Sequence, residues 1–134
     1  MPSISSTDEA IALVIGAVPS SANKRLRMHW SARKAEDEAI EWQLIAAIKR
    51  STHRCKADGR RAWVSIHFTM RGRDDDLDNR VARAKGLIDA LTRQGVIVDD
   101  SPEWCRFRPF TRERTTGRNM TTVTVEYVEA FRGA

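Results

Sequence analysis

The chain has 134 residues, of which 41% are hydrophobic and 31% charged, so we expect one globular domain and exclude wholesale disorder. Its longest apolar run, Ala10 to Val18, is too short to span a bilayer and follows acidic residues, unlike a signal peptide. Its two cysteines, Cys55 and Cys105, provide no disulfide framework. These features predict an intracellular, cytoplasmic protein with no membrane partner.

Lysines and arginines number 23 against 18 acidic residues, for a net charge of +5. Six of the ten aspartates fall in two short clusters, which are Asp74, Asp75, Asp76 and Asp78, and then Asp99 and Asp100. Without these six, 23 basic residues face 12 acidic ones. A basic body around concentrated acidic spots is typical of a protein that binds a polyanion and a cation. Ordinary solvated surface charge is the alternative interpretation.

The first half of the chain predicts one strand, one loop and one long helix. Residues 1–9 are expected to be disordered, residues 10–17 to form a buried strand, and residues 21–30 to form a loop. A helix is predicted from its N-cap Ser31 to about Arg50. Its expected buried residues are Ala35, Ala39, Trp42, Ile45 and Ile48.

The second half predicts four strands around one helix. Strict alternation over 62–70 is the clearest strand signal in the chain. The other predicted elements are a helix over 79–94 ended by Gly95 at its C′ position, strands over 96–98, 105–110 and 121–128, and a basic loop over 111–118. The whole chain, 1–134, is therefore predicted to be a single α+β (α/β) domain with a small mixed β-sheet packed against two helices.

Four carboxylates crowd the segment RGRDDDLDN. Each close pair of like charges costs about 1 kcal/mol in water, which raises carboxyl pKa values unless a cation compensates. In an extended chain Asp76 and Asp78 project to the same side, as ligands of one hard cation do. The following 16-residue helix carries the chain about 24 Å away from these aspartates. If the chain then runs back in extended form from Gly95 to Asp100, it covers about 16 Å of that distance. We therefore expect Asp100 to join Asp76 and Asp78 at one end of the sheet.

The acidic cluster, the histidines and the cysteines each have other possible interpretations. An EF-hand loop is rejected because Asn79 and Lys85 occupy the positions that require Gly and Glu. The remaining alternative for the cluster is structural, with Asp78 as a helix cap and its neighbours solvated. The histidines and cysteines lack the spacing of zinc ligands, and His67 is interpreted as an ordinary strand residue. No phosphate-binding glycine loop or GxSxG elbow is present.

The same region resembles a known family. It carries a series of motifs in a fixed order, which are Asp76-Leu77-Asp78-Asn79, then Lys85 with Asp89-Ala90-Leu91, then Gly95 and Asp99-Asp100. This series is similar to the pattern of the RusA family of Holliday junction resolvases, which are small phage-associated endonucleases. The stretch 19–23 with Arg25 and 29–31 resembles the N-terminal loop of the family more weakly. The resemblance covers about residues 10–128.

The resemblance implies a homodimer that cuts four-way DNA junctions with Mg²⁺ or Mn²⁺ and needs no organic cofactor. It implies that Asp76, Asp78 and Asp100 are metal-site residues and that Lys85 is the catalytic lysine. Asn79 and Asp89 are implied as supporting positions, with helix capping and an i,i+4 pair to Lys85 as their plain structural alternatives. A bound divalent ion activates water, and a lysine neutralises charge on the phosphate.

Basic side chains are available for the DNA backbone. The candidates for phosphate contacts are Lys24, Arg25, Arg27, Arg73, Arg106, Arg108, Arg112, Arg114 and Arg118. Trp30 and Trp104 are interpreted either as base-stacking residues or as core residues. The alternative function is a nucleic-acid-binding protein of the same fold that does not cut, or one that acts on flaps, forks or RNA.

Helical geometry favours Lys85 as the residue that faces the acidic site. Lys85 follows Asp78 by seven residues. On an α-helix this separation places the two residues about 20° apart around the axis and about 10.5 Å apart along it. Arg83 lies about 140° around from Asp78 and is therefore predicted to point away from the site.

Overall fold

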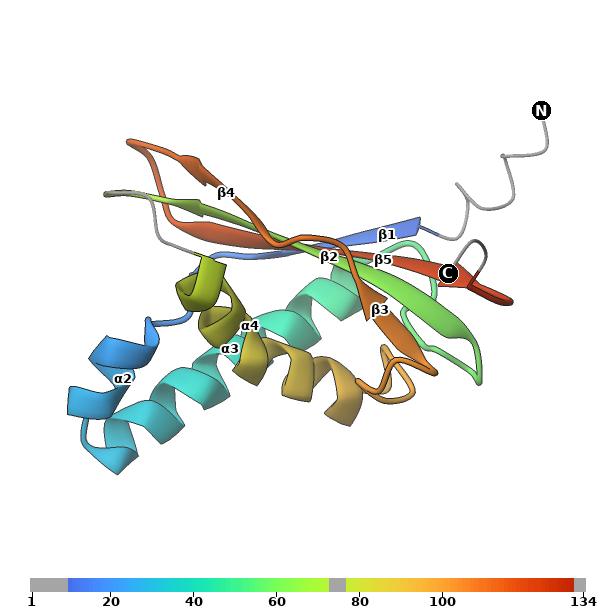
Figure 1. Cartoon of the computed structure of the whole chain (residues 1–134), viewed down its shortest axis with the longest axis horizontal. Coiled ribbons are helices and arrows are strands. Elements are labelled where there is room, and N and C mark those ends of the chain that lie inside the picture. The colour runs from blue at the N-terminus through green and yellow to red at the C-terminus, as the bar shows by residue number, and fades with distance from the viewer. Residues whose placement is uncertain (1–9, 73–76, 132–134) are drawn as a thin grey trace.

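The computed structural model describes residues 10–72 and 77–131, without the side chains of 77 and 78. In chain order the elements are β1 (Ala10–Ile15), α2 (Ala22–Arg27), α3 (Trp30–Arg50), β2 (Arg61–Met70), α4 (Leu77–Arg93), β3 (Cys105–Phe107), β4 (Thr111–Arg114) and β5 (Met120–Val128) (Figure 1). The expected disorder of residues 1–9 lies outside the described residues. In the described part no helix is long and apolar enough to cross a membrane.

The five strands form one mixed sheet in the order β1-β5-β2-β3, and β4 also pairs with β2. The neighbours β1 and β5, and β5 and β2, are antiparallel. Both short strands run parallel to β2 along the same edge, with Cys105 beside Ala62 and Arg114 beside Met70. The predicted small mixed sheet is therefore confirmed.

The alternation in β2 decides which face of the sheet is covered. Ala62, Val64, Ile66 and Phe68 are fully buried, and their neighbours in the strand are half-buried. Helices α3 and α4 lie side by side against this one face, and the described chain leaves the other face uncovered (Figure 1). One hydrophobic core between the helices and the sheet holds the domain together.

Helix α2 lies in the segment that was predicted to be a loop, so that prediction is wrong. The side chain of Ser21 caps the helix by accepting a hydrogen bond from the Lys24 N–H at 3.3 Å. No residue of α2 is buried. A short polar helix of this kind produces no hydrophobic periodicity, so periodicity does not predict it.

The predicted buried face of α3 is largely wrong, because Ala35 and Ala39 are exposed, although Ile48 does pack against the core. The helix buries Ile40, Leu44 and Ala47, whereas Trp42 is 68% exposed on the opposite side. The apolar residues of α3 occupy two sides of the helix, so periodicity alone does not say which side meets the sheet. The N-cap is His29 rather than Ser31.

The segment after α4 also differs from the prediction. Gly95 has a φ of 73° and ends the helix in the left-handed conformation that was expected. The predicted strand over 96–98 is absent, because the chain folds back on the helix, with the Val96 N–H bonded to the Leu91 carbonyl at 2.9 Å. The Tyr127 hydroxyl donates to the Val96 carbonyl at 2.7 Å and holds this turn beneath the sheet. Farther on, residues 111–114 form β4 where a loop was expected.

Candidate active site

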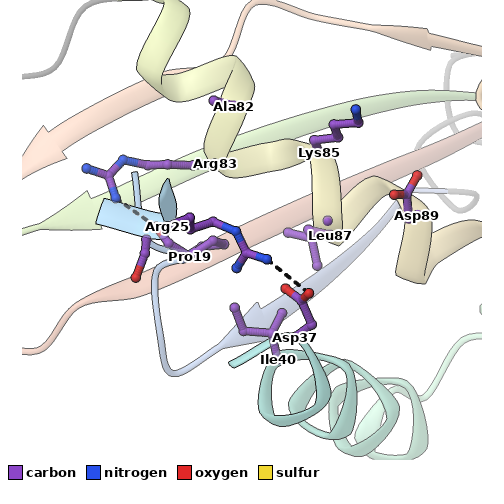
Figure 2. Close-up of a pocket in the computed structure, with 11 residues that line it drawn as sticks. Pro19, Arg25, Asp37, Ile40, Ala82, Arg83, Lys85, Leu87 and Asp89 are labelled. Carbon is purple, nitrogen blue, oxygen red and sulfur yellow. Dashed lines mark hydrogen bonds and ion pairs between the residues drawn. The ribbon is translucent and has the colours of Figure 1, made fainter. Parts of the chain in front are cut away.

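A cavity of about 220 Å³ lies where α2, α3 and α4 meet (Figure 2). The segment before α2 supplies Pro19 and Ser20, and α2 supplies Arg25. Helix α4 supplies Lys85 and Asp89 on the other side. Two stretches that are far apart in the sequence, and that each resemble the RusA family, therefore line one cavity.

One wall of this cavity is a hydrogen-bonded carboxylate network. Glu36 accepts from the Ser20 N–H at 3.1 Å, from the Ser20 hydroxyl at 2.5 Å and from Arg25 Nη1 at 2.8 Å. Arg25 also donates through Nη2 to Asp37 at 3.0 Å (Figure 2). Burial disfavours the charged form of Glu36, but the bonds from Ser20 and Arg25 outweigh it and lower its pKa. The Glu36 carboxylate therefore stays ionised and holds the segment before α2 against α3.

Arg83 forms the second wall of the cavity. Its Nη1 donates to the Pro19 carbonyl at 2.7 Å, and the side chain lines the cavity (Figure 2). The expectation that Arg83 points away from the acidic residues stays a prediction, because the side chains of Asp76 and Asp78 lie outside the described part of the chain. The segment before α2 passes along the flank of α4 that carries Arg83, so the direction of Arg83 leads into the cavity wall. Arg83 thus ties α4 to the segment before α2.

Lys85 differs from the other cations of the cavity because it has no partner in the described part of the chain. Its side chain is exposed, and the ion pair with Asp89 that was the plain structural alternative is not formed. The neighbouring Ala84 and Leu87 are buried to 1% exposure or less, which fixes the rotation of α4. Lys85 therefore lies at the rim of the cavity with its side chain exposed, and it makes no hydrogen bond or ion pair within residues 10–72 and 77–131.

Of the first acidic cluster, the structure describes only the backbone of Asp78. Asp74, Asp75 and Asp76, together with Arg73, fall outside the described residues. The helix begins at Leu77, two residues earlier than predicted, and this places Asp78 in its first turn. A carboxylate in a first turn is stabilised by the helix dipole.

The second acidic cluster lies beyond the other end of α4. The Ala62 N–H donates to the Trp104 carbonyl at 3.0 Å, and the Cys105 N–H donates to the Ser101 carbonyl at 2.9 Å. Asp100 is therefore beside the start of β2, whereas α4 begins after the end of β2. From Asp78 the helix runs about 22 Å before it ends. The extended return that was expected to bring Asp100 back to Asp78 does not occur within one chain.

The surroundings of Cys105 agree with this placement of Asp100. Burial raises the pKa of the Cys105 thiol to about 12, and the negative charges of Asp100 and Asp99 add to the effect. Among residues 10–72 and 77–131, no group of three histidine, cysteine, aspartate or glutamate side chains is placed to hold a metal ion.

The candidate phosphate-binding residues divide into two sets. Four of them are exposed and make no side-chain hydrogen bond or ion pair within the described residues. These are Lys24 and Arg27 on α2, Arg114 at the end of β4, and Arg118 in the connection from β4 to β5. Helix α2, the start of α4 and the connection from β4 to β5 lie at the same end of the molecule (Figure 1).

The other set already has protein partners. Arg25 binds Glu36 and Asp37, and Arg112 donates to backbone carbonyls. Arg108 is 2.9 Å from Glu126 and stacks on Trp63 at 4.8 Å. Arg106 stacks on the ring of Phe131 at 4.4 Å. The two tryptophans considered for base stacking also differ in exposure. Trp30 is 62% exposed, whereas Trp104 is half-buried under the guanidinium of Arg61.

Sequence reasoning missed the network of Ser20, Glu36 and Asp37. From the sequence alone, Glu36 and Asp37 only stand in the early turns of a predicted helix, where the helix dipole favours acids, which is a local role. Their contacts with Ser20 and Arg25 span 11 to 16 residues in sequence. The only available signal was the weak resemblance of the stretch 19–25.

No family model matches this chain, and no curated protein is similar to it in sequence. The resemblance to the RusA family consequently rests on the motifs themselves. In the structure, Pro19, Ser20 and Arg25 of one such stretch and Lys85 and Asp89 of the other line the same cavity.

Proposed function

We propose that this protein is a metal-dependent endodeoxyribonuclease that cuts branched DNA, with the four-way junction as its substrate. The observation that carries the proposal is the cavity that joins Lys85 of α4 to the segment before α2. Lys85 lacks an internal partner in the described chain, which is what a lysine that contacts substrate requires. The exposed basic residues of α2, of the end of β4 and of the β4–β5 connection, which make no side-chain hydrogen bond or ion pair within the described residues, lie at the same end of the molecule.

The donor chemistry fits a hard divalent cation. Asp76 and Asp78 supply carboxylate oxygens, which Mg²⁺ and Mn²⁺ prefer over nitrogen and sulfur. A bound ion of this kind supplies an activated water for phosphodiester hydrolysis. Lys85 stabilises the negative charge that develops on the scissile phosphate. The exposed lysines and arginines hold the DNA backbone without reading its sequence.

A homodimer belongs to this proposal. Two strands of a junction must be cut, and a two-fold symmetric dimer presents two identical sites. Asp100 enters a site with Asp78 only from a second copy of the chain, because the length of α4 separates the two residues within one copy. A dimer would therefore reconcile the resemblance, which implies that Asp100 is a metal-site residue, with the distance between Asp100 and Asp78 in one chain.

A cleavage assay on a synthetic four-way junction, with and without Mg²⁺ or Mn²⁺, tests the proposal. We expect paired nicks that depend on the metal, and little cutting of a linear duplex. If the protein cuts flaps, forks or RNA in preference to the junction, the proposed substrate is wrong, but the proposed metal-dependent hydrolysis stands. Junction binding without cutting in either metal would contradict the enzyme proposal and favour a non-catalytic binding protein.

A further inference from the structure

Helix α3 has a second apolar face, which the core does not use. Its buried residues Ile40, Leu44 and Ala47 belong to the core between the helices and the sheet. Trp42 lies about 160° around the helix from Leu44. It is 68% exposed, and no described element lies on this side of α3 (Figure 1). A tryptophan that becomes buried removes about 150 to 250 Å² of surface from water, so covering this ring is worth a large gain in free energy.

Small and apolar residues surround Trp42 on the same face. Ala39 and Ala46 lie three residues before it and four residues after it, within one turn of the ring. Ile45 is half-buried beside the ring, and the exposed Ala35 continues the face toward the start of the helix. One bulky ring thus stands among shallow positions. A second helix can approach closely at the alanines, and a bulky side chain of its own then fills the space above them.

Two opposite charges stand on the same line of α3. Glu38 and Lys49 are exposed, and neither makes a hydrogen bond or ion pair within the described residues. Their positions differ by eleven residues, which is about 20° around the helix and about 16.5 Å along it. Trp42 lies between them, about 2 Å from their midpoint along the axis. The apolar face is therefore bounded by an acid at one end and a base at the other.

This charge pattern is complementary to itself when the helix direction is reversed. If α3 packs antiparallel on α3 of a second copy, Glu38 of each copy meets Lys49 of the other, and two equivalent ion pairs form. The two-fold axis then passes beside Trp42, so the two rings pack together at the centre. Parallel packing would place like charges opposite each other. An interface between identical copies requires this kind of self-complementarity.

The uncovered face of the sheet is less suited to the same role. It presents hydroxyl side chains, including Ser65 on β2 and Thr122 and Thr124 on β5, which lose hydrogen bonds to water when a partner covers them. Its aromatic ring, Trp63, is already in contact with Arg108 and Phe131. The exposed apolar residues that have no covering group are those of α3.

We propose that the face of α3 centred on Trp42 and bounded by Glu38 and Lys49 is the surface through which two copies of the chain form a homodimer. The inference deepens the proposed function and rests on it for the existence of a homodimer. Trp42 is the central anchor, because large aromatic side chains at the desolvated centre carry most of the energy of an interface. Glu38 and Lys49 set the antiparallel direction.

Light scattering and sedimentation equilibrium over a range of protein concentrations test this surface. The wild-type protein should have twice the chain mass, and Trp42→Glu should raise the Kd of the dimer by about 100-fold or more. The side chain of Trp42 is exposed within one copy, so the variant should keep the wild-type circular dichroism spectrum. Trp30→Glu is the matched control, because Trp30 is 62% exposed on the same helix but about 120° around it from Trp42. This control should remain a dimer.

Reversal of the two charges tests the antiparallel direction. Glu38→Lys alone places two lysines together at each end of the interface, and Lys49→Glu alone places two acids there. Each single variant should weaken the dimer by about tenfold. The double variant restores opposite charges and should return the Kd to within about threefold of wild type. A double variant that dimerises no better than either single variant would overturn the proposed packing.

Two results would overturn the surface itself. One is a wild-type protein that stays monomeric, which would leave this face to a different partner. The other is a Trp42→Glu variant that dimerises as tightly as wild type, which would place the dimer contact elsewhere on the chain. Metal-dependent cutting of a four-way junction by the wild-type protein, measured on the same preparations, would leave the nuclease proposal standing in either case. Failure to cut, together with a dimer that Trp42→Glu disrupts, would contradict the nuclease proposal and support this surface.

Discussion

The cations of α2, α4 and the end of β4 differ in their surroundings from the arginines around β3. Lys85 on α4 and Arg114 at the end of β4 make no side-chain hydrogen bond or ion pair within the described residues. Arg106 on β3 and Arg108 just after it already stack on the rings of Phe131 and Trp63. Uncompensated cations are available to a polyanion, whereas stacked and paired ones stabilise the fold. We therefore expect the cations of α2, α4 and the end of β4 to contact the DNA backbone, and the arginines around β3 to stabilise the fold.

The largest expected effect concerns the acidic clusters themselves. Asp78→Asn and Asp100→Asn should each reduce junction cleavage by about 100-fold or more, because each removes a metal ligand. Junction binding should be unchanged or tighter, since a repulsive charge is lost. Cleavage and electrophoretic binding assays on the same preparations measure both effects.

Mixing the two variants sharpens this prediction. If Asp100 acts from a second copy, a dimer of one Asp78→Asn chain and one Asp100→Asn chain contains one intact site, so part of the cleavage returns. Recovery of activity in the mixture is the expected outcome. Full activity of Asp100→Asn alone would remove Asp100 from the site and leave the start of α4 as the whole metal centre.

Lys85→Ala should have the next largest effect. Removing a charge that is aimed at the transition state is expected to lower kcat by about 100-fold while the Kd for the junction changes little. Lys34→Ala is the control, because Lys34 is also an exposed lysine without a partner in the described residues but lies on α3. Equal activities of the two variants would show that Lys85 plays no special part.

The arginines of the two groups should differ in kind. Arg114→Gln should weaken junction binding and reduce the slope of log affinity against log salt by about one, as expected for one lost phosphate contact. Arg108→Gln should leave that slope unchanged and lower Tm instead, because it loses Glu126 and its stack on Trp63. A reversed result, with the salt slope changed only by Arg108→Gln, would contradict the comparison.

The smallest effect is the pH dependence of the cavity wall. Because Glu36 has a lowered pKa when folded, its stabilisation is complete above its ordinary value of 4.5 and is lost as the pH falls through the folded pKa. Glu36→Gln should therefore cost about 1 kcal/mol near pH 7, and the difference from wild type should vanish in acid. Thermal unfolding of the wild type and the variant from pH 3 to pH 7 measures this difference. A difference that stays constant over this pH range would show that ionisation of Glu36 is not involved.

The sequence by itself determined the elements whose signals are local. Alternation in 62–70 identified β2 and its buried face, and Gly95 marked the end of α4. Periodicity, caps and glycine conformations act between neighbouring residues, so they are readable without the fold. The same holds for the motifs around Asp78 and Lys85, whose spacing along one helix follows from its geometry.

Only the tertiary structure decided what depends on contacts between distant segments. It placed Trp42 outside although α3 offered two apolar sides, and it brought Ser20 to Glu36 across 16 residues. It also separated Asp100 from Asp78, because Val96 and Ile97 bury themselves beneath the sheet and do not extend as a strand. Burial of these side chains is a property of the whole core, and a local pattern does not encode which surface will cover it.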